Sequence, residues 1–138
     1  MQVGGPRTTS EAASISIERI GDILAGLPVP TFVIDATHRI THWNRACEVV
    51  LGHPASRMLG TRDQWLPFYP RPRPVMADLV VSGELDTGID TYYRDKYRRS
   101  QLIPGCYEAE DFFPNMGAQG TWLYFTAAPL RDASGAVV

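Results

Sequence analysis

The segment that most limits the fold is TWLYFTAAPL at residues 121–130. Its aromatic and β-branched residues predict a strand, in which successive side chains point to opposite faces. Trp122 and Tyr124 then lie on one face, while Leu123 and Phe125 lie on the other, so both faces are apolar. A sheet with one solvated face instead alternates apolar and polar residues. The sequence therefore predicts a sheet covered on both sides: by helices and a pocket on one, and by the amino-terminal helix or a partner subunit on the other.

An earlier segment predicts a hairpin that leads directly into a helix. Residues 31–35 and 39–43 are rich in β-branched and aromatic residues, and Asp35 begins a polar turn between them. Asn44 follows the second strand, where its side-chain oxygen can accept a bond from a free N–H of the next helix. Gly52 stands where that helix needs a left-handed residue to end.

The middle of the chain is stiff and aromatic, then helical, then polar. Residues 63–74 combine four prolines with aromatic residues and predict a non-regular segment that lies on an apolar surface. Pro74 is predicted at the first position of a helix with an apolar stripe over residues 75–80. Residues 90–100 are predicted to be a solvated helix or loop whose tyrosines lie on the surface, and residues 105–113 a strand edge or loop.

The two ends of the chain carry the remaining predicted elements. Residues 1–9 predict a flexible tail, and residues 10–27 predict a helix. Two interpretations of this helix stay open, because its repeat is too short for a coiled coil to be assigned: it lies on its own domain, or it pairs two subunits. Near the other end, Gly135 belongs to a hairpin turn before a last strand that starts at residue 136. The apolar stripe proposed as a dimer interface consists of Ile17, Ile20, Leu24 and Leu27.

Composition excludes several functional classes. The 138 residues suit one domain, and the formal net charge of -2 gives no basic excess for nucleic acid or anionic lipid. Cys47 and Cys106 are too few for a secreted disulfide framework, so a cytoplasmic location is expected. His38, His42 and His53 belong to no catalytic or metal-binding motif. We therefore expect neither an enzyme nor a metal site, and no membrane contact by this segment.

The order of these elements resembles a PAS sensor domain. The resemblance is carried by residues 28–60 and 121–138, in which Asn44, Pro129 and Asp132 occupy family positions together with the turn glycine. It implies an α+β PAS fold with a five-stranded antiparallel sheet, short helices on one face and an amino-terminal flanking helix. The PAS domain would span residues 28–138, with its last strand truncated.

The resemblance also implies a function. PAS domains are sensory modules of larger signalling proteins, most often histidine kinases of two-component systems, so we expect a small organic ligand, a homodimer and an output domain in the same chain. The alternatives are a ligand-free dimerisation or protein-interaction module, or the sensor of a diguanylate cyclase or a DNA-binding regulator. Haem and LOV-type flavin are disfavoured, because no histidine follows residue 53 and no reactive-cysteine motif is present. The expected pocket lining is Trp43, Trp65, Phe68, Tyr69, Met76, Tyr107, Tyr124 and Thr126.

Overall fold

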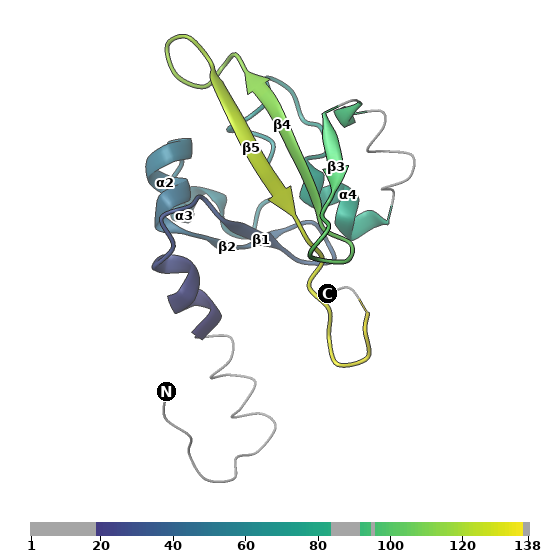
Figure 1. The fold of residues 1–138 in the computed structure, drawn as a ribbon. Coiled ribbons are helices and arrows are strands. Elements are labelled where there is room, and N and C mark those ends of the chain that lie inside the picture. Colours follow the sequence, from purple (N-terminus) through teal and green to yellow (C-terminus); the bar gives the residue numbers. More distant parts are fainter. Residues whose placement is uncertain (1–18, 84–91, 95, 137–138) are drawn as a thin grey trace.

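The chain folds into short helices and antiparallel strands (Figure 1). The computed structural model describes residues 19–83, 92–94 and 96–136. Residues 19–25 are helical and are called the flanking helix below. The other elements are β1 (Phe32–Ile34), β2 (Ile40–Trp43), α2 (Arg45–Leu51), α3 (Ala55–Met58), α4 (Met76–Ser82), β3 (Tyr97–Arg99), β4 (Tyr107–Phe113) and β5 (Thr121–Ala127).

The predicted first hairpin is present as β1 and β2, which pair antiparallel. Asp35 Oδ1 closes the turn by accepting hydrogen bonds from the backbone N–H groups of Thr37 and Arg39, at 2.8 and 3.1 Å. The Thr37 hydroxyl also donates to this carboxylate, and that bond is the main reason why the pKa of Asp35 is lowered. His38 takes the left-handed conformation in the turn, with φ of 67°. The turn is therefore built from local side-chain to backbone bonds, as the sequence predicts.

Asn44 joins three segments of the chain. Its Oδ1 accepts from the N–H of Cys47 at 2.9 Å, which confirms the predicted helix cap, and also from the N–H of Thr31 at 3.0 Å. Its Nδ2 donates to the carbonyl oxygens of Leu24 at 3.1 Å and Val29 at 2.9 Å. All four bonds are made by a side chain that is almost fully buried. Asn44 thus fixes the end of the flanking helix against α2 and the hairpin.

The five strands form two sheets rather than the single sheet that the sequence predicts. β1 pairs with β2, and β4 lies between β3 and β5 in the second sheet. Within the part of the chain described, no strand bridges β1 and β5, so each keeps a free edge. The turn predicted before the last strand is closed by Asp132 N–H, which donates to the Ala136 carbonyl at 3.0 Å. The rest of the predicted last strand, residues 137 and 138, falls outside the described residues.

The polar segment at residues 90–100 is predicted to be a solvated helix or loop, but within it Tyr97–Arg99 form β3 and pair with β4. Tyr93 is only 1% exposed, and its hydroxyl lies 3.1 Å from that of Tyr69. Burial raises the pKa of both phenols. The segment is therefore part of the fold, with Tyr93 directed inward.

α4 confirms its predicted apolar stripe but begins later than expected. Pro74 does not occupy the first helical position, because the helix begins at Met76 after an extended Val75. The Asp78 carboxylate accepts from the Val75 N–H at 2.9 Å and so satisfies a backbone donor at the start of the helix. α4 packs behind the β3–β4–β5 sheet in the view of Figure 1.

Two clusters of buried side chains form the core. One lies between α4 and the inner face of the β3–β4–β5 sheet, and the other lies between the first hairpin, α2 and α3. The outer face of the larger sheet is left uncovered by any described helix (Figure 1). The first cluster contains Met76, Leu79, Tyr93, Tyr107 and Ala109, and the second contains Ile34, Ile40, Trp43, Cys47 and Met58.

Cys47 is predicted to be unreactive in the folded protein. Burial raises the pKa of its thiol to about 11, so at pH 8 only about one molecule in a thousand carries the reactive thiolate. We expect iodoacetamide at pH 8 to label Cys47 at least tenfold more slowly in the native protein than in urea, as followed by mass spectrometry. As the pH rises above about 9, the thiol of the unfolded chain ionises before that of the folded protein, which favours the unfolded state. The contribution of Cys47 to the free energy of unfolding therefore falls between pH 9 and pH 11. Equal labelling rates in both states would contradict this account.

Candidate ligand-binding groove

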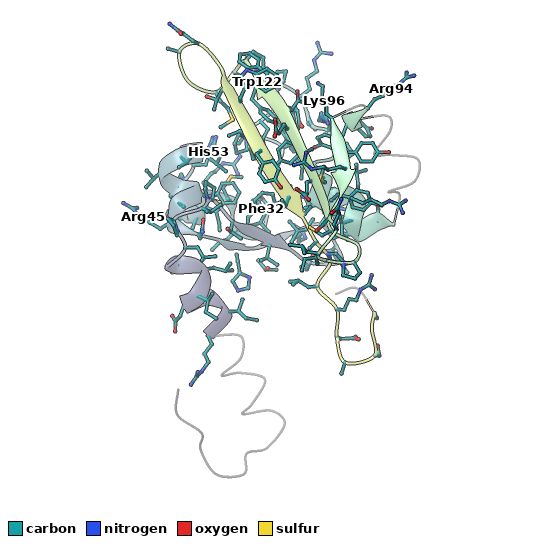
Figure 2. The ribbon with its side chains drawn as sticks, in the orientation of Figure 1. Phe32, Arg45, His53, Arg94, Lys96 and Trp122 are labelled. Carbon is teal, nitrogen blue, oxygen red and sulfur yellow. The ribbon has the colours of Figure 1, made fainter. Side chains whose placement is uncertain are left out.

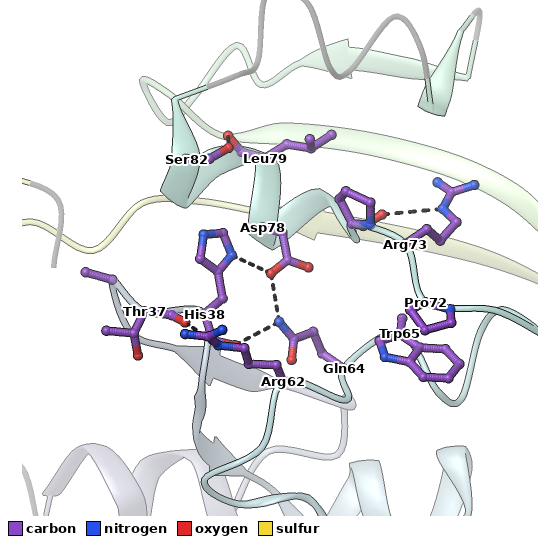
Figure 3. Close-up of a pocket in the computed structure, with 12 residues that line it drawn as sticks. Thr37, His38, Arg62, Gln64, Trp65, Pro72, Arg73, Asp78, Leu79 and Ser82 are labelled. Carbon is purple, nitrogen blue, oxygen red and sulfur yellow. Dashed lines mark hydrogen bonds and ion pairs between the residues drawn. The ribbon is translucent and has the colours of Figure 1, made fainter.

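A groove of about 750 Å³ opens between the first hairpin turn, the proline-rich segment and α4 (Figure 3). Residues 36–38 form one wall, residues 62–74 supply several side chains of a second, and α4 closes the third. Trp65, Pro72 and Pro74 contribute apolar surface, and the exposed lining as a whole is more apolar than polar. The groove is open to solvent, so a bound molecule would lie against its walls rather than be enclosed by them.

The Asp78 carboxylate organises the groove. His38 Nδ1 lies 2.7 Å from Asp78 Oδ1, a distance at which the ring N–H donates to the carboxylate. Gln64 Nε2 donates to the same oxygen at 2.7 Å, and the Val75 N–H donates to Oδ2. Figure 3 shows the three side chains converging from three different segments. The network therefore holds the hairpin turn, the proline-rich segment and α4 together.

Gln64 is the buried member of this network. The residue is 1% exposed, and its Nε2 also donates to the His38 carbonyl at 3.0 Å. Its Oε1 is buried and accepts no hydrogen bond from any of the described residues. An unpaired buried polar group costs about 1–3 kcal/mol. The groove lining therefore includes an amide that has one acceptor unused.

Two arginines give the groove an excess of positive charge. Arg73 stacks on aromatic rings, with its Cζ 3.9 Å from the centre of the Tyr69 ring and 5.2 Å from that of Tyr93. Arg62 Nε donates to the Thr37 carbonyl at 2.9 Å. Within the described ranges, neither guanidinium has a carboxylate partner. The groove thus carries two guanidinium groups against the single carboxylate of its central network.

The structure distributes the predicted pocket residues over several places. Trp65 lines the groove, and it alone among the eight predicted residues appears in its lining. Trp43, Met76 and Tyr107 lie in the two core clusters, and the rings of Phe68 and Tyr69 pack on Phe113. The remaining two, Tyr124 and Thr126, lie on the outer face of the β3–β4–β5 sheet.

The sequence interpretation missed His38, Gln64 and Asp78 as a group. They are 14 to 40 residues apart, and no motif spacing links them. One signal was available: Gln64 is a polar side chain in the largely apolar stretch at residues 63–69, which was predicted to lie on an apolar surface. A polar residue at such a position is expected to have a buried partner.

The glycine predicted in the last turn and the residues predicted at a dimer interface lie near opposite ends of the described chain. Gly135 has φ of 86° in the turn that follows β5, a conformation that favours glycine. Ile20 and Leu27 are exposed and Leu24 is half-buried, while Ile17 lies outside the described residues.

Among the residues with described positions, no group of three or more His, Cys, Asp or Glu side chains is arranged to hold a metal ion. No helix in the same part of the chain is long and apolar enough to cross a membrane.

Comparisons with known proteins identify the fold. Residues 18–62 match a family model described as the PAS fold. A solved structure described as an RNA-binding light-oxygen-voltage receptor aligns with a TM-score of 0.54 and 17% identity. The alignment covers 99% of this chain and 34% of that one, so this chain spans about a third of that protein's length.

The search of curated proteins finds no match. The likeness to a light-oxygen-voltage receptor runs against the prediction that LOV-type flavin is disfavoured, but at this identity it concerns the fold alone. The absence of flavin therefore stays a prediction. Together, the family model and the structural alignment show that this chain has the PAS fold.

Proposed function

We propose that this chain is a PAS sensor module that binds a small organic molecule in the groove and passes its occupancy to an output domain. The observation that carries the proposal is the groove itself, which places the half-buried ring of Trp65 and the guanidinium groups of Arg62 and Arg73 around one open space. A small organic ligand with an apolar part and a hydrogen-bond acceptor would find a partner for each of them. The module is assigned to the cytoplasm, with no enzymatic activity of its own.

The contacts of the groove suggest how occupancy is relayed. His38 lies in the turn of the first hairpin, and Asn44 follows the other end of its second strand. Asn44 in turn donates to the Leu24 carbonyl of the flanking helix. A ligand that favours one position of the hairpin therefore favours one position of that helix. The ligand can cause such a shift only if it binds the two positions of the hairpin with different affinities. The free energy that couples two sites in this way is typically about 1–3 kcal/mol.

The proposed output domain is a histidine kinase of a two-component system, joined to the module in one chain. A diguanylate cyclase or a DNA-binding regulator are the alternatives. A second candidate function is a ligand-free dimerisation module, which is favoured by the exposed aromatic residues on the outer sheet face. The two functions differ in one respect, because only the sensor needs an occupied groove.

A ligand screen tests the sensor proposal. The purified protein would be examined by native mass spectrometry for a bound compound and by thermal shift against a metabolite panel. We expect at least one compound to raise the melting temperature in a concentration-dependent manner, because it binds the native state. A broad panel that moves nothing, with no bound compound, would favour the ligand-free module.

Matched tryptophan variants locate the binding site. Trp65→Leu removes apolar surface from the groove, whereas Trp122→Leu makes the same change on the outer sheet face. The apparent affinity for the compound is taken from the shift in melting temperature relative to each unliganded variant. This affinity should fall at least tenfold for Trp65→Leu and stay unchanged for Trp122→Leu. The reverse pattern would place the ligand outside the groove.

A further inference from the structure

The guanidinium group of Arg73 lies against three tyrosine rings at the wall of the groove. Its Cζ is 3.9 Å from the centre of the Tyr69 ring, and 4.9 and 5.2 Å from the centres of the Tyr92 and Tyr93 rings. Contact with the ring faces fixes the plane of a guanidinium, while its N–H donors point outward within that plane. The hydrogen bonds that Arg73 donates to the carbonyls of Pro74 and Tyr92 are long, at 3.4 and 3.5 Å. Arg73 therefore presents an oriented set of donors whose bonds within the chain are weak.

The carboxylates near the groove do not neutralise its arginines. Asp63 follows Arg62 in the chain, but its carboxylate pairs with Arg57 at 3.0 Å. The Asp78 carboxylate is engaged by the donors of its own network. Among the residues of described position, no carboxylate lies within ion-pair distance of Arg62 or Arg73. An anion that enters from solvent would therefore be attracted by two positive charges that pair with no described carboxylate.

Trp65 supplies a flat apolar surface beside these charges. Its side chain lines the groove and is half-buried. Within the described ranges, the ring stacks on no other aromatic ring and on no guanidinium, and the indole N–H donates no hydrogen bond. Figure 3 shows Trp65, Pro72 and Arg73 together on one side of the view, and Arg62 beside His38 on the other. A planar ring that stacks on Trp65 would therefore place an attached acid group close to Arg73.

We propose that the ligand of the groove is a planar organic acid, with its ring on Trp65 and its carboxylate or phosphate oxygens on Arg73. The inference rests on the proposed function and deepens it, because it names the chemical class of ligand for the same groove. The paired N–H donors of a guanidinium match the two oxygens of such an anion, and charge-assisted bonds are roughly twice as strong as neutral ones. The groove volume of about 750 Å³ lies within the range of small-molecule sites, about 300–1,000 Å³.

Matched pairs of compounds test the need for charge. Naphthylacetate would be compared with its uncharged amide, and naphthyl phosphate with uncharged naphthol, by isothermal titration calorimetry of the purified protein. We expect at least one of the two anions to bind at least tenfold more tightly than its neutral partner. The preference between the anions then shows which acid group the groove accepts. Anions that bind no better than their neutral partners would overturn the proposal.

Arginine variants locate the acid group. Arg73→Gln should lower the affinity for the bound anion at least tenfold and leave the affinity for its neutral partner unchanged. Arg71→Gln is the matched control, because Arg71 is an exposed arginine of the same proline-rich segment outside the groove lining. It removes the same charge and should leave both affinities unchanged. An equal loss of anion affinity for both variants would show attraction by overall charge and would overturn the site.

Other variants keep the test decisive if Arg73→Gln fails to fold. Arg73→Lys retains the charge but not the paired donors, so it should still weaken anion binding at least fivefold. Trp65→Leu should weaken the anion and its neutral partner alike, whereas Trp122→Leu, near one end of the larger sheet in Figure 2, should weaken neither. A neutral compound that binds in the groove, when no anion does, would overturn this proposal and leave the sensor function standing. Failure of every compound to bind would overturn both.

Discussion

Asn44→Ala should lower the free energy of unfolding by about 3 kcal/mol. Loss of the helix cap costs about 1 kcal/mol. The change also leaves the Thr31 N–H and the carbonyls of Leu24 and Val29 without their side-chain partner. Each polar group that stays buried and unpaired adds to this loss. Urea unfolding followed by circular dichroism measures the effect.

Asn44→Asp separates the cap from the anchor of the flanking helix. An aspartate keeps acceptor oxygens for the N–H groups of Cys47 and Thr31 but loses the donors to Leu24 and Val29. We expect this variant to keep α2 while limited proteolysis near residues 25–30 becomes faster. If both variants unfolded like the parent protein and resisted protease equally, the role assigned to Asn44 would be wrong.

Asp78→Ala should destabilise the protein by a similar amount, about 2–4 kcal/mol. The change removes an acceptor shared by His38, Gln64 and the Val75 N–H. Gln64 is buried, so its amide loses a charge-assisted bond that water cannot easily replace. Thermal and urea unfolding measure the loss, and the groove should lose affinity for any compound found by the screen.

Asp78→Asn is the conservative control for this network. The amide keeps one acceptor oxygen in nearly the same shape but has no negative charge for His38 Nδ1. We expect a smaller loss, about 1–2 kcal/mol, with the start of α4 retained. An equal loss for both variants would mean that charge alone stabilises the network. No loss for Asp78→Ala would contradict the central position given to this carboxylate.

The features that were predicted correctly depend on short-range bonds. The Asp35 turn and the Asn44 cap each join residues two to four positions apart, so residue type and order are sufficient to predict them. The apolar stripe of α4 is likewise visible as a repeat in the sequence. The apolar outer face of β5 was also predicted, whereas its covering by the amino-terminal helix or a partner subunit stays a prediction.

The features that were missed depend on distant partners. Tyr93 is buried because its ring meets Phe125 and its hydroxyl meets Tyr69, which is 24 residues earlier. β3 is short and polar, and it is a strand only because β4 offers a pairing edge. The groove likewise draws its three polar groups from separate segments. Such contacts are set by the tertiary fold, which local propensity does not encode.

Occupancy of the groove is proposed to reach the flanking helix through the first hairpin. Hydrogen–deuterium exchange, with and without a compound identified by the screen, detects such a relay. We expect altered exchange at residues 36–40 and 62–66, and also in the flanking helix, and we expect Asn44→Asp to remove only the change in the helix. Altered exchange confined to the groove of the parent protein would contradict the relay.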